Sequence, residues 1–463
     1  MEISLCPLPK SEKTEVFCRN GDFWFPVLVF LPLFIAPVSK YQPSVSHHIH
    51  FLATPSPSIP YVFDLSIYWT INISSDKMSS IIVLALHTLL LPFVNSSPSL
   101  PAISCTPNSM NQTQTVTSAV VINTNPATPF EAVKLSAINQ TAWESYRFEG
   151  VSNNGTAGVS VNFYRSPSPS ACGYGAVWVE INAVWSDSTQ FTSTQWQNQS
   201  VIIDCDVDIN AVTYGYWEDV LDTTARFTFQ VPHTLAWANM TLFGDGIDGS
   251  WQMNSIAPPM TANATGQFNP QGSVELAPLT YWNEAIPVAT LNTTIQFPGR
   301  VFDIEGFGGH WRNWASYDWN SLALDWYRVR AVAGPYIMIF WVYTSAIDGQ
   351  IYTSGILVQN GTRVFASRNG SPTPGSDSAI FWLSYSGNVH GSYEDNSTGI
   401  TVQFTGGREW RFFITHTNVL SESPYGKKYS SFVNTAIGGD IEGPQFAGVA
   451  TSDQAVIPNP VPI

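Results

Sequence analysis

Short runs in which every second residue is apolar recur along the chain from about residue 115 to its end. Clear examples lie at residues 158–164, 176–181, 225–230, 350–355, 399–404 and 410–415. Alternation with a period of two places apolar side chains on one face of a β-strand, and the Gly, Pro, Asn and Asp residues between the runs are typical of turns. The pattern therefore predicts an all-β protein built from antiparallel barrels or sandwiches. Helical periodicity is nearly absent, and residues 318–331 are the best short candidate for a helix.

A gap in the strand pattern at residues 277–287 divides the patterned region roughly in half. The chain of 463 residues is long enough for two domains that each bury a core. We therefore expect an N-terminal β domain at residues 110–285 and a C-terminal β domain at residues 286–455. The Pro-rich tail at residues 456–463 is expected to be loosely held.

The first 77 residues lack sustained strand or helix periodicity. Their apolar run at residues 23–38 is a rival signal or membrane anchor, but three prolines interrupt it and it is short for a membrane span. Met78 begins a second apolar stretch, which ends in small residues and has the anatomy of a secretory signal peptide, although no positive residue follows Met78. We predict that translation starts at Met78 and that residues 78–97 are the signal peptide. Residues 1–77 are then a gene-model extension or a disordered segment.

Asn-x-Ser/Thr sequons occur along the whole region that follows the predicted signal peptide, and sequons of this kind are glycosylated on secreted proteins. They begin at Asn111, Asn139, Asn154, Asn198, Asn239, Asn263, Asn292, Asn360 and Asn396. We therefore expect a secreted, N-glycosylated protein. An oxidising compartment permits a disulfide, and the cysteines left in this region are Cys105, Cys172 and Cys205. We expect Cys172 to pair with Cys205, because strand-like segments carry both, which leaves one thiol over.

Composition excludes several classes of function. The net charge of −15 is spread along the chain and no cluster of Lys and Arg stands out, which argues against nucleic-acid binding. The sequence contains no Gly-x-Ser-x-Gly, no His-Glu-x-x-His and no P-loop pattern. We expect neither a cofactor nor a bound metal.

The segment at residues 304–343 is the most informative part of the chain. It opens with a glycine cluster and passes through several tryptophans into a strand-like apolar run at residues 336–343. Hydrogen-bond donors are crowded there among flat, rigid aromatic rings, while acids and thiols are scarce. Such a set suits a pocket that holds a large apolar molecule by its shape and polarises it at one or two points.

Several ordered motifs resemble one known superfamily. Residues 143–150, Trp-Glu-Ser-Tyr-Arg-Phe-Glu-Gly, resemble the early strand pair of the lipocalin-like carotenoid-hydratase superfamily. Residues 302–314 contain Gly-His-Trp-Arg-Asn-Trp, which resembles its Gly-His-Asp-His-Asn-Trp motif. Residues 281–287 and 330–336 are most similar to the fungal Diels–Alderase branch. The resemblance extends over most of residues 140–420.

The resemblance implies two lipocalin-like antiparallel β-barrel or sandwich domains with a ligand cavity at or near their junction. Trp311 and Arg312 stand where the hydratase-type motif has an acid and a histidine, whereas His310 is retained. Adding water to an alkene requires a proton donor, so this departure favours a cyclase over a hydratase.

A secreted member resembles the hetero-Diels–Alderases of fungal secondary metabolism that join a tropolone-derived quinone methide to a humulene-type alkene. The implied partners are hydrophobic polyenes or terpenoids and enones or quinone methides, with no nucleic acid and no stable membrane span.

A [4+2] cycloaddition moves no net proton, so it depends on confinement of the reacting groups and on a hydrogen bond that polarises one of them. The candidate catalytic residues are Glu144, His310, Arg312 and Asn313. The candidate substrate-binding residues are Trp143, Tyr146, Arg147, Trp282, Trp311, Trp314, Trp326, Tyr343, Arg408, Trp410 and His416. A tryptophan in a β-barrel is more often part of the core than a ligand wall, and arginines at barrel ends commonly form structural salt bridges.

Two other functions fit parts of the sequence. A secreted glycoside hydrolase on a β-sandwich would use paired acids, either Asp303 with Glu305 or Glu218 with Asp219, and tryptophans as sugar platforms. A non-catalytic, lipocalin-like terpenoid carrier would have the same apolar pocket and would bind product as well as substrate.

Overall fold

The computed structural model describes residues 105–167, 175–205, 211–219, 225–263, 272–372, 374–392, 396–422, 428–457 and 460. All of these residues belong to one compact unit, which includes residues 100–463. The predicted extension at residues 1–77, the predicted signal peptide and most of the C-terminal tail lie outside the described residues. Within the described ranges, no helix is both long enough and apolar enough to cross a bilayer.

Fourteen of the described strands form one antiparallel sheet, the first sheet. Its main path runs in the order β1-β6-β7-β8-β9-β10-β13-β14-β2-β3-β4-β5, and β11 and β12 both pair with β13. The strands are β1 Cys105–Asn111, β2 Trp143–Ser152, β3 Gly158–Arg165, β4 Val177–Val184, β5 Gln190–Trp196, β6 Gln199–Cys205, β7 Val212–Glu218, β8 Arg226–Pro232, β9 Trp237–Gly244, β10 Ile247–Ser255, β11 Met260–Thr261, β12 Glu275–Ala277, β13 Thr280–Phe297 and β14 Arg300–Ala315.

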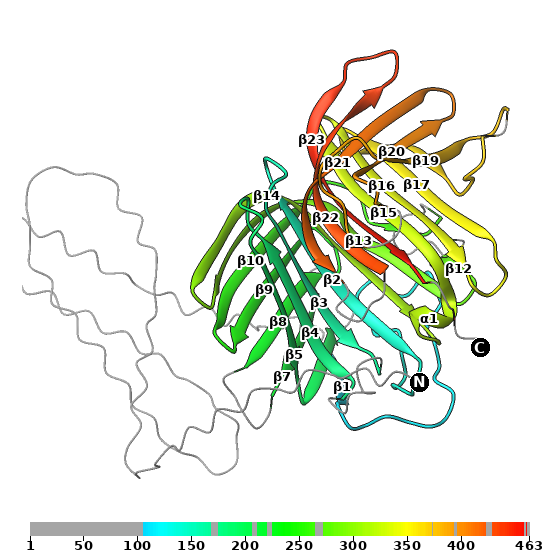
Figure 1. Cartoon of the computed structure of the whole chain (residues 1–463). Coiled ribbons are helices and arrows are strands. Elements are labelled where there is room, and N and C mark those ends of the chain that lie inside the picture. The colour runs from blue at the N-terminus through cyan, green and yellow to red at the C-terminus, as the bar shows by residue number, and fades with distance from the viewer. Residues whose placement is uncertain are drawn as a thin grey trace, which may run out of the picture. The chain divides into compact units, whose positions relative to one another are not determined.

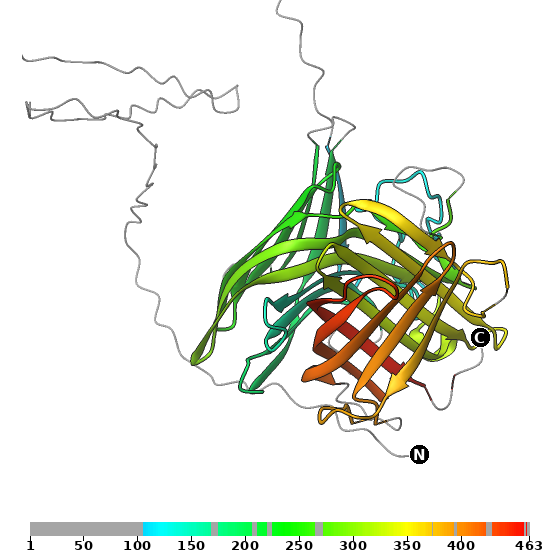
Figure 2. The same cartoon turned by 90° about the horizontal axis from the view of Figure 1, so that it is seen from above.

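Nine further strands among the described residues form the second sheet, in the order β18-β17-β16-β15-β23-β22-β21-β20-β19. They are β15 Ala323–Ala333, β16 Tyr336–Ser345, β17 Ile351–Gln359, β18 Thr362–Ser367, β19 Ser378–Ser384, β20 Gly399–Thr405, β21 Glu409–Glu422, β22 Lys428–Asp440 and β23 Phe446–Val456. Both sheets curl: the first forms a half-barrel and the second a nearly closed barrel (Figures 1 and 2). The prediction of an all-β protein with barrel-like sheets is confirmed.

Strand burial shows where the sheets meet. In β9 the inward residues alternate with exposed ones, as the period of two predicts for a strand with one wet face. By contrast, every residue of β2 is buried, as is the second half of β14. These strands are covered on both faces, because one face lies on the core of the first sheet and the other faces the second sheet, where β2 contacts β23.

The connection between the sheets differs from the one expected. The boundary placed between residues 285 and 286 falls inside β13, a continuous strand. The chain changes sheet later, after β14, through the single helical turn α1, Trp319–Leu322. Asp318 caps this turn, because its side chain accepts from the backbone N–H groups of Asn320 and Ser321. The helix stops there, and most of the candidate range 318–331 is strand β15 instead.

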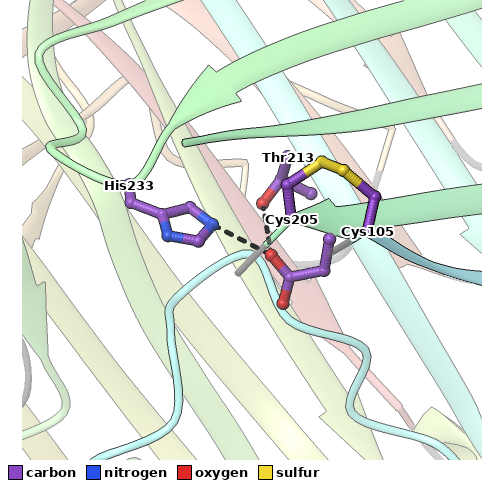
Figure 3. The surroundings of a disulfide bond; sticks show 5 residues. Cys105, Cys205, Thr213 and His233 are labelled. Atoms are coloured by element: carbon purple, nitrogen blue, oxygen red, sulfur yellow. Dashed lines mark hydrogen bonds and ion pairs between the residues drawn. A yellow bond between two sulfur atoms is a disulfide. The ribbon is translucent and has the colours of Figure 1, made fainter. Parts of the chain in front are cut away.

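The disulfide in the structure joins Cys105 to Cys205 and corrects the predicted Cys172–Cys205 pair (Figure 3). The two cysteines face each other across the β1–β6 ladder, with 3.9 Å between their Cα atoms. Sequence patterning at Cys172 and Cys205 could not reveal that β1 forms the edge strand next to β6. Cys172 itself lies outside the described residues. Beside the bond, Asp204 accepts from Thr213 and is paired with His233 at 2.9 Å.

Candidate functional site at the junction of the two sheets

A buried cluster of charges lies between the sheets. Glu149 of β2 and Glu284 of β13 come from the first sheet, and Arg328 and Arg330 of β15 come from the second. Arg328 donates to Glu149 Oε1 at 3.0 and 3.1 Å and to Glu284 Oε1 at 3.1 Å. Arg330 donates to Glu149 Oε1 at 2.6 Å and also pairs with Glu284. Asp453 of β23 accepts from Arg328 at 3.2 Å, so two sheets share one ionic network.

The charges in this network hold each other in the ionised form. Burial alone would raise the pKa of Glu149, but the guanidinium groups of Arg328, Arg330 and Arg147 outweigh it and hold the pKa well below its usual range. Burial would likewise lower the pKa of Arg328, and the carboxylates around it raise that pKa instead. Removing one partner of such a network leaves an uncompensated buried charge, so the cluster fastens the sheets together.

An aromatic cluster adjoins the charges. Trp341 of β16 lies edge-on to Trp282 of β13 and to Trp311 of β14, with ring centroids 5.1 and 5.6 Å apart. The Trp326 indole donates to Asp453 at 2.8 Å, and the Tyr343 hydroxyl is 3.2 Å from the hydroxyl of Thr280. Flat rings from both sheets therefore pack against one another at the junction, and aromatic walls of this kind suit a site for an unsaturated hydrocarbon.

Cations cover the ring of Trp311. The Arg328 guanidinium is 4.1 Å from the ring centroid and the Arg147 guanidinium is 5.2 Å from it. Arg147 is also 3.5 Å from Glu149. Trp311 therefore stands where the charge cluster and the aromatic cluster meet, and cation–π attraction fixes its ring there.

Three indole N–H groups in the aromatic cluster are not used inside the protein. The Nε1 atoms of Trp282, Trp311 and Trp341 are buried and have no hydrogen-bond acceptor among the described residues. Leaving a buried donor unsatisfied costs about 1–3 kcal/mol, so native proteins rarely keep one without a reason. Buried indole N–H groups of this kind also occur at Trp178, Trp251 and Trp410, but among the described residues only the aromatic cluster brings three of them into ring contact.

Among the described residues, a hollow of about 280 Å³ lies where Ser188 and Gln190, at the β4–β5 turn of the first sheet, face residues 388–390 and Asn418 and Val419 of the second sheet. Little open space is found beside the charge cluster. The space beside Arg330 and Thr451 measures about 10 Å³, room for roughly one water molecule. Its other walls are Val151, Val288, Phe307, Gly308, Ala331, Val332, Val449 and Ala450. The long charged and aromatic side chains from both sheets fill the volume there. A ligand of the size of a terpenoid therefore binds there only if these side chains move.

The four residues predicted to be catalytic lie away from this cluster or are engaged with protein groups. Arg312 is fully buried, donates to the carbonyls of Phe130 and Ala132 at 2.7 Å each, and pairs with Glu144 at 3.0 Å. Glu144 also binds Arg165 at 3.1 Å and accepts from the backbone of Lys134. These contacts fasten the segment before β2 onto the inner face of the first sheet.

His310 lies on the same inner face as Arg312. Its Nε2 is 3.0 Å from Glu131, its Nδ1 is 3.0 Å from the Arg147 carbonyl, and its ring is stacked on Phe148 at 4.0 Å. Asn313 accepts a hydrogen bond from Ser145. Both nitrogens of His310, the terminal nitrogens of Arg312 and the side-chain oxygen of Asn313 are thus bound to protein groups, whereas Arg312 Nε has no acceptor among the described residues.

The predicted substrate-binding residues divide into groups. Arg147, Trp282, Trp311, Trp326 and Tyr343 gather at the junction. Tyr146 lies in the core of the first sheet, and Trp410 lies in that of the second. Trp143 and Trp314 pack near the segments around Trp319 and Lys134, His416 is stacked on Phe432, and Arg408 is largely exposed.

Sequence analysis did not identify Trp341, Glu149, Glu284 or Asp453 as members of a site. Trp341 falls in the apolar run at residues 336–343, where it resembles an ordinary core residue. Glu149 falls on the polar parity of β2, where alternation predicts exposure. Asp453 carried a usable signal, because it shares the parity of Ala447, Val449 and Ala455 in β23, a parity that alternation would bury. Charges at such positions are rarely buried without partners.

The chain is similar to proteins of one known family. A family model described as Diels-Alderase-like matches residues 102–458. The Diels-Alderase pyiF of Pyricularia grisea is 30% identical over 339 residues, which cover 72% of this chain and 79% of that protein. The hexane cyclase gkaB of Penicillium citrinum is 29% identical, over 69% of this chain and 75% of that protein.

A solved structure supports the fold independently. The crystal structure of CghA matches with a TM-score of 0.64 at 22% identity, over 76% of this chain and 98% of CghA. The same protein with Sch210972 matches with a TM-score of 0.62. At this identity, the likeness establishes how the chain folds.

Proposed function

Because this chain belongs to the Diels–Alderase-like family, we propose that it catalyses a [4+2] cycloaddition at the junction between its two sheets. Membership in the family makes the chain a cyclase of the Diels–Alderase type, and its relatives carry the names Diels-Alderase and hexane cyclase. The observation that supports placing the reaction at this junction is the group of buried indole N–H donors without acceptors at Trp282, Trp311 and Trp341.

Confinement supplies most of the rate acceleration in this proposal. The reaction forms two σ bonds from π electrons, so its barrier is largely the cost of bringing diene and alkene together in one orientation. Fully oriented intramolecular systems gain about 7–11 kcal/mol in this way. Rings contributed by both sheets can hold two flat fragments face to face. A hydrogen bond to one partner adds a smaller electronic contribution.

Substrate binding in this proposal is coupled to rearrangement of aromatic side chains. The space beside Arg330 and Thr451 is about 10 Å³, whereas ligand pockets commonly measure on the order of 300–1,000 Å³. The ionic network of Glu149, Glu284, Arg328 and Arg330 resists separation of the sheets. Rotation of rings such as Trp341 and Trp326, rather than opening of the sheets, makes room for the substrate.

The substrate pair that we favour is a tropolone-derived quinone methide with a humulene-type alkene. This finer assignment is supported by the expectation of secretion, which is itself a proposal. Several sequon asparagines are exposed, which fits glycosylation: Asn154, Asn239, Asn292, Asn360 and Asn396. A mass shift after treatment of the purified protein with an N-glycosidase tests the glycosylation directly.

The cyclase proposal is tested with two kinds of substrate. One is an open-chain ester that carries both a conjugated diene and an activated alkene, and the other is the quinone methide mixed with humulene. The expected result with at least one of them is faster adduct formation than with heat-denatured protein and enrichment of one stereoisomer on chiral chromatography. Binding of both partners without acceleration would instead identify a carrier.

The hydrolase alternative has less support. Asp303 and Glu305 are exposed on the outer side of β14, and Asp303 accepts a hydrogen bond from Thr294. Glu218 pairs with Arg226 at 3.4 Å. Release of reducing sugar from polysaccharides, without cycloaddition, would support the hydrolase function instead.

A further inference from the structure

The hydrogen-bond donors of the Gly-His-Trp-Arg-Asn-Trp segment differ in how many of them have acceptors within the protein. Arg312 uses its terminal nitrogens on two carbonyls and Glu144, and both nitrogens of His310 lie within 3.0 Å of protein oxygens. Trp311, between them in the sequence, is 4% exposed and its Nε1 has no acceptor among the described residues. Arg312 Nε also has no acceptor among the described residues, but Arg312 lies on the inner face of the first sheet. On the side of the second sheet, the unused donor of this segment is the Trp311 indole.

The surroundings of Trp311 also favour it as a donor over its neighbours. The guanidinium groups of Arg328 and Arg147 lie over its ring at 4.1 and 5.2 Å. A positive charge beside the ring favours donation from the N–H group toward an oxygen on which negative charge develops. Trp282 and Trp341 have the same unused donor, but no cation is recorded over either ring within the described part of the chain.

We propose that Trp311 is a catalytic hydrogen-bond donor whose Nε1–H binds a carbonyl oxygen conjugated with one of the reacting π systems. This inference deepens the proposed function and rests on it. The substrate class is then an enone or a quinone methide, since an unfunctionalised polyene offers no acceptor. The indole proton stays on nitrogen throughout. The bond to oxygen lowers the acceptor orbital and stabilises charge as two carbon–carbon bonds form and the π bonds rearrange.

Two variants separate hydrogen bonding from packing. Trp311→Phe keeps an aromatic ring under the arginines and removes the N–H group. Trp251→Phe is the matched control, because Trp251 is also fully buried with an indole that lacks an acceptor among the described residues, but lies in the core of the first sheet. The probe is β-ionone, a small conjugated enone whose absorption moves to longer wavelength when its carbonyl accepts a hydrogen bond.

The full chain is produced with ¹⁵N-labelled tryptophan and titrated with β-ionone. We expect the indole signal that is missing in Trp311→Phe to move downfield and the absorption of the probe to shift to longer wavelength. Trp251→Phe should retain the absorption shift and Trp311→Phe should lose it. With a cyclising substrate that carries a conjugated carbonyl, kcat of Trp311→Phe should fall by roughly 10- to 100-fold relative to Trp251→Phe.

Several results would overturn the inference. They are failure of β-ionone to bind, binding that leaves the Trp311 indole signal in place, and an absorption shift that persists in Trp311→Phe. A fall in turnover of that variant with an unchanged absorption shift would assign the residue to packing. If no substrate cyclises but the two spectroscopic shifts appear, the hydrogen bond is supported and the proposed catalysis fails.

Discussion

Two faces of β14 carry neighbouring residues into contrasting surroundings. On the face toward the core of the first sheet, His310 and Arg312 are bound to Glu131, Glu144 and backbone carbonyls. On the face toward the second sheet, Trp311 has cations over its ring and an unused N–H group. The comparison teaches that polar side chains in a motif do not mark a site by themselves. A buried donor that has no acceptor within the protein is a better indication of a ligand-binding site.

The largest effect is expected from breaking the ionic network at the junction. Glu149→Ala removes the shared acceptor of Arg328 and Arg330, and the two guanidinium groups remain buried. We expect the free energy of unfolding, measured with urea, to fall by about 3–5 kcal/mol. Glu218→Gln removes one charge of a partly exposed pair with Arg226 and should change it by about 0–1 kcal/mol. Equal losses in the two variants would contradict a structural role for the network.

A comparable but more local effect is expected on the inner face. Arg312→Met deprives the carbonyls of Phe130 and Ala132 and the carboxylate of Glu144 of a buried donor. The free energy of unfolding should fall by about 3 kcal/mol, because groups bound to a charged donor lose their partner. Turnover of the folded fraction should stay within roughly threefold of the wild type. A large loss of kcat in a variant that remains folded would restore Arg312 as a catalytic candidate.

The two buried clusters should also respond to different ranges of pH. Burial, reinforced by Arg312, lowers the pKa of Lys134 to about 7 in the folded chain, against about 10.4 in an unfolded chain. Between these values the unfolded chain binds more protons, so stability rises with pH from about 7 to about 10, by at most about 1.4 kcal/mol per pH unit. Lys134→Met should flatten this rise in urea unfolding.

The stability contributed by the ionic network at the junction should change at acid pH instead. The pKa of Glu149 lies well below its usual value, so its stabilising contribution is present above about pH 4 and is lost as the pH falls further. Lys134→Met should leave this acid limb unchanged. An alkaline rise that is the same in Lys134→Met and in the wild type would show that another group controls it.

Much of the fold could be predicted from the sequence, because period-two alternation is a local signal. Strands such as β3 and β20 fall where the pattern places them. The early end of the helix at Leu322 and the pairing of Cys205 with Cys105 depended instead on neighbours distant in the sequence. β1 lies next to β6 only because the whole sheet is assembled, and no local pattern encodes that.

The site was predicted only in part for a related reason. Alternation puts His310 and Trp311 on opposite faces of a strand, but it does not say which face meets a second sheet. The structure brings Trp311 and Arg147 together with Trp282 and Trp326 at the junction, and their role in substrate binding stays a prediction. Trp341 was missed, because an apolar strand predicts its burial and not its neighbours.

The smallest effect we predict is a coupling energy between two hydrogen-bonded hydroxyls at the junction. The buried hydroxyls of Thr280 and Tyr343 are 3.2 Å apart, so each is the hydrogen-bond partner of the other. Thr280→Val and Tyr343→Phe should each lower the free energy of unfolding by about 1–2 kcal/mol, because each leaves one buried hydroxyl alone. The double variant leaves none, and its loss should be smaller than the sum of the single losses by about 1 kcal/mol in a urea double-mutant cycle. Additive losses would mean that the pair does not interact in solution. The two hydroxyls would then lack hydrogen-bond partners, as the indoles beside them do. In that case the contrast between Trp311, which has no acceptor, and neighbouring groups that are hydrogen-bonded would no longer hold within the junction.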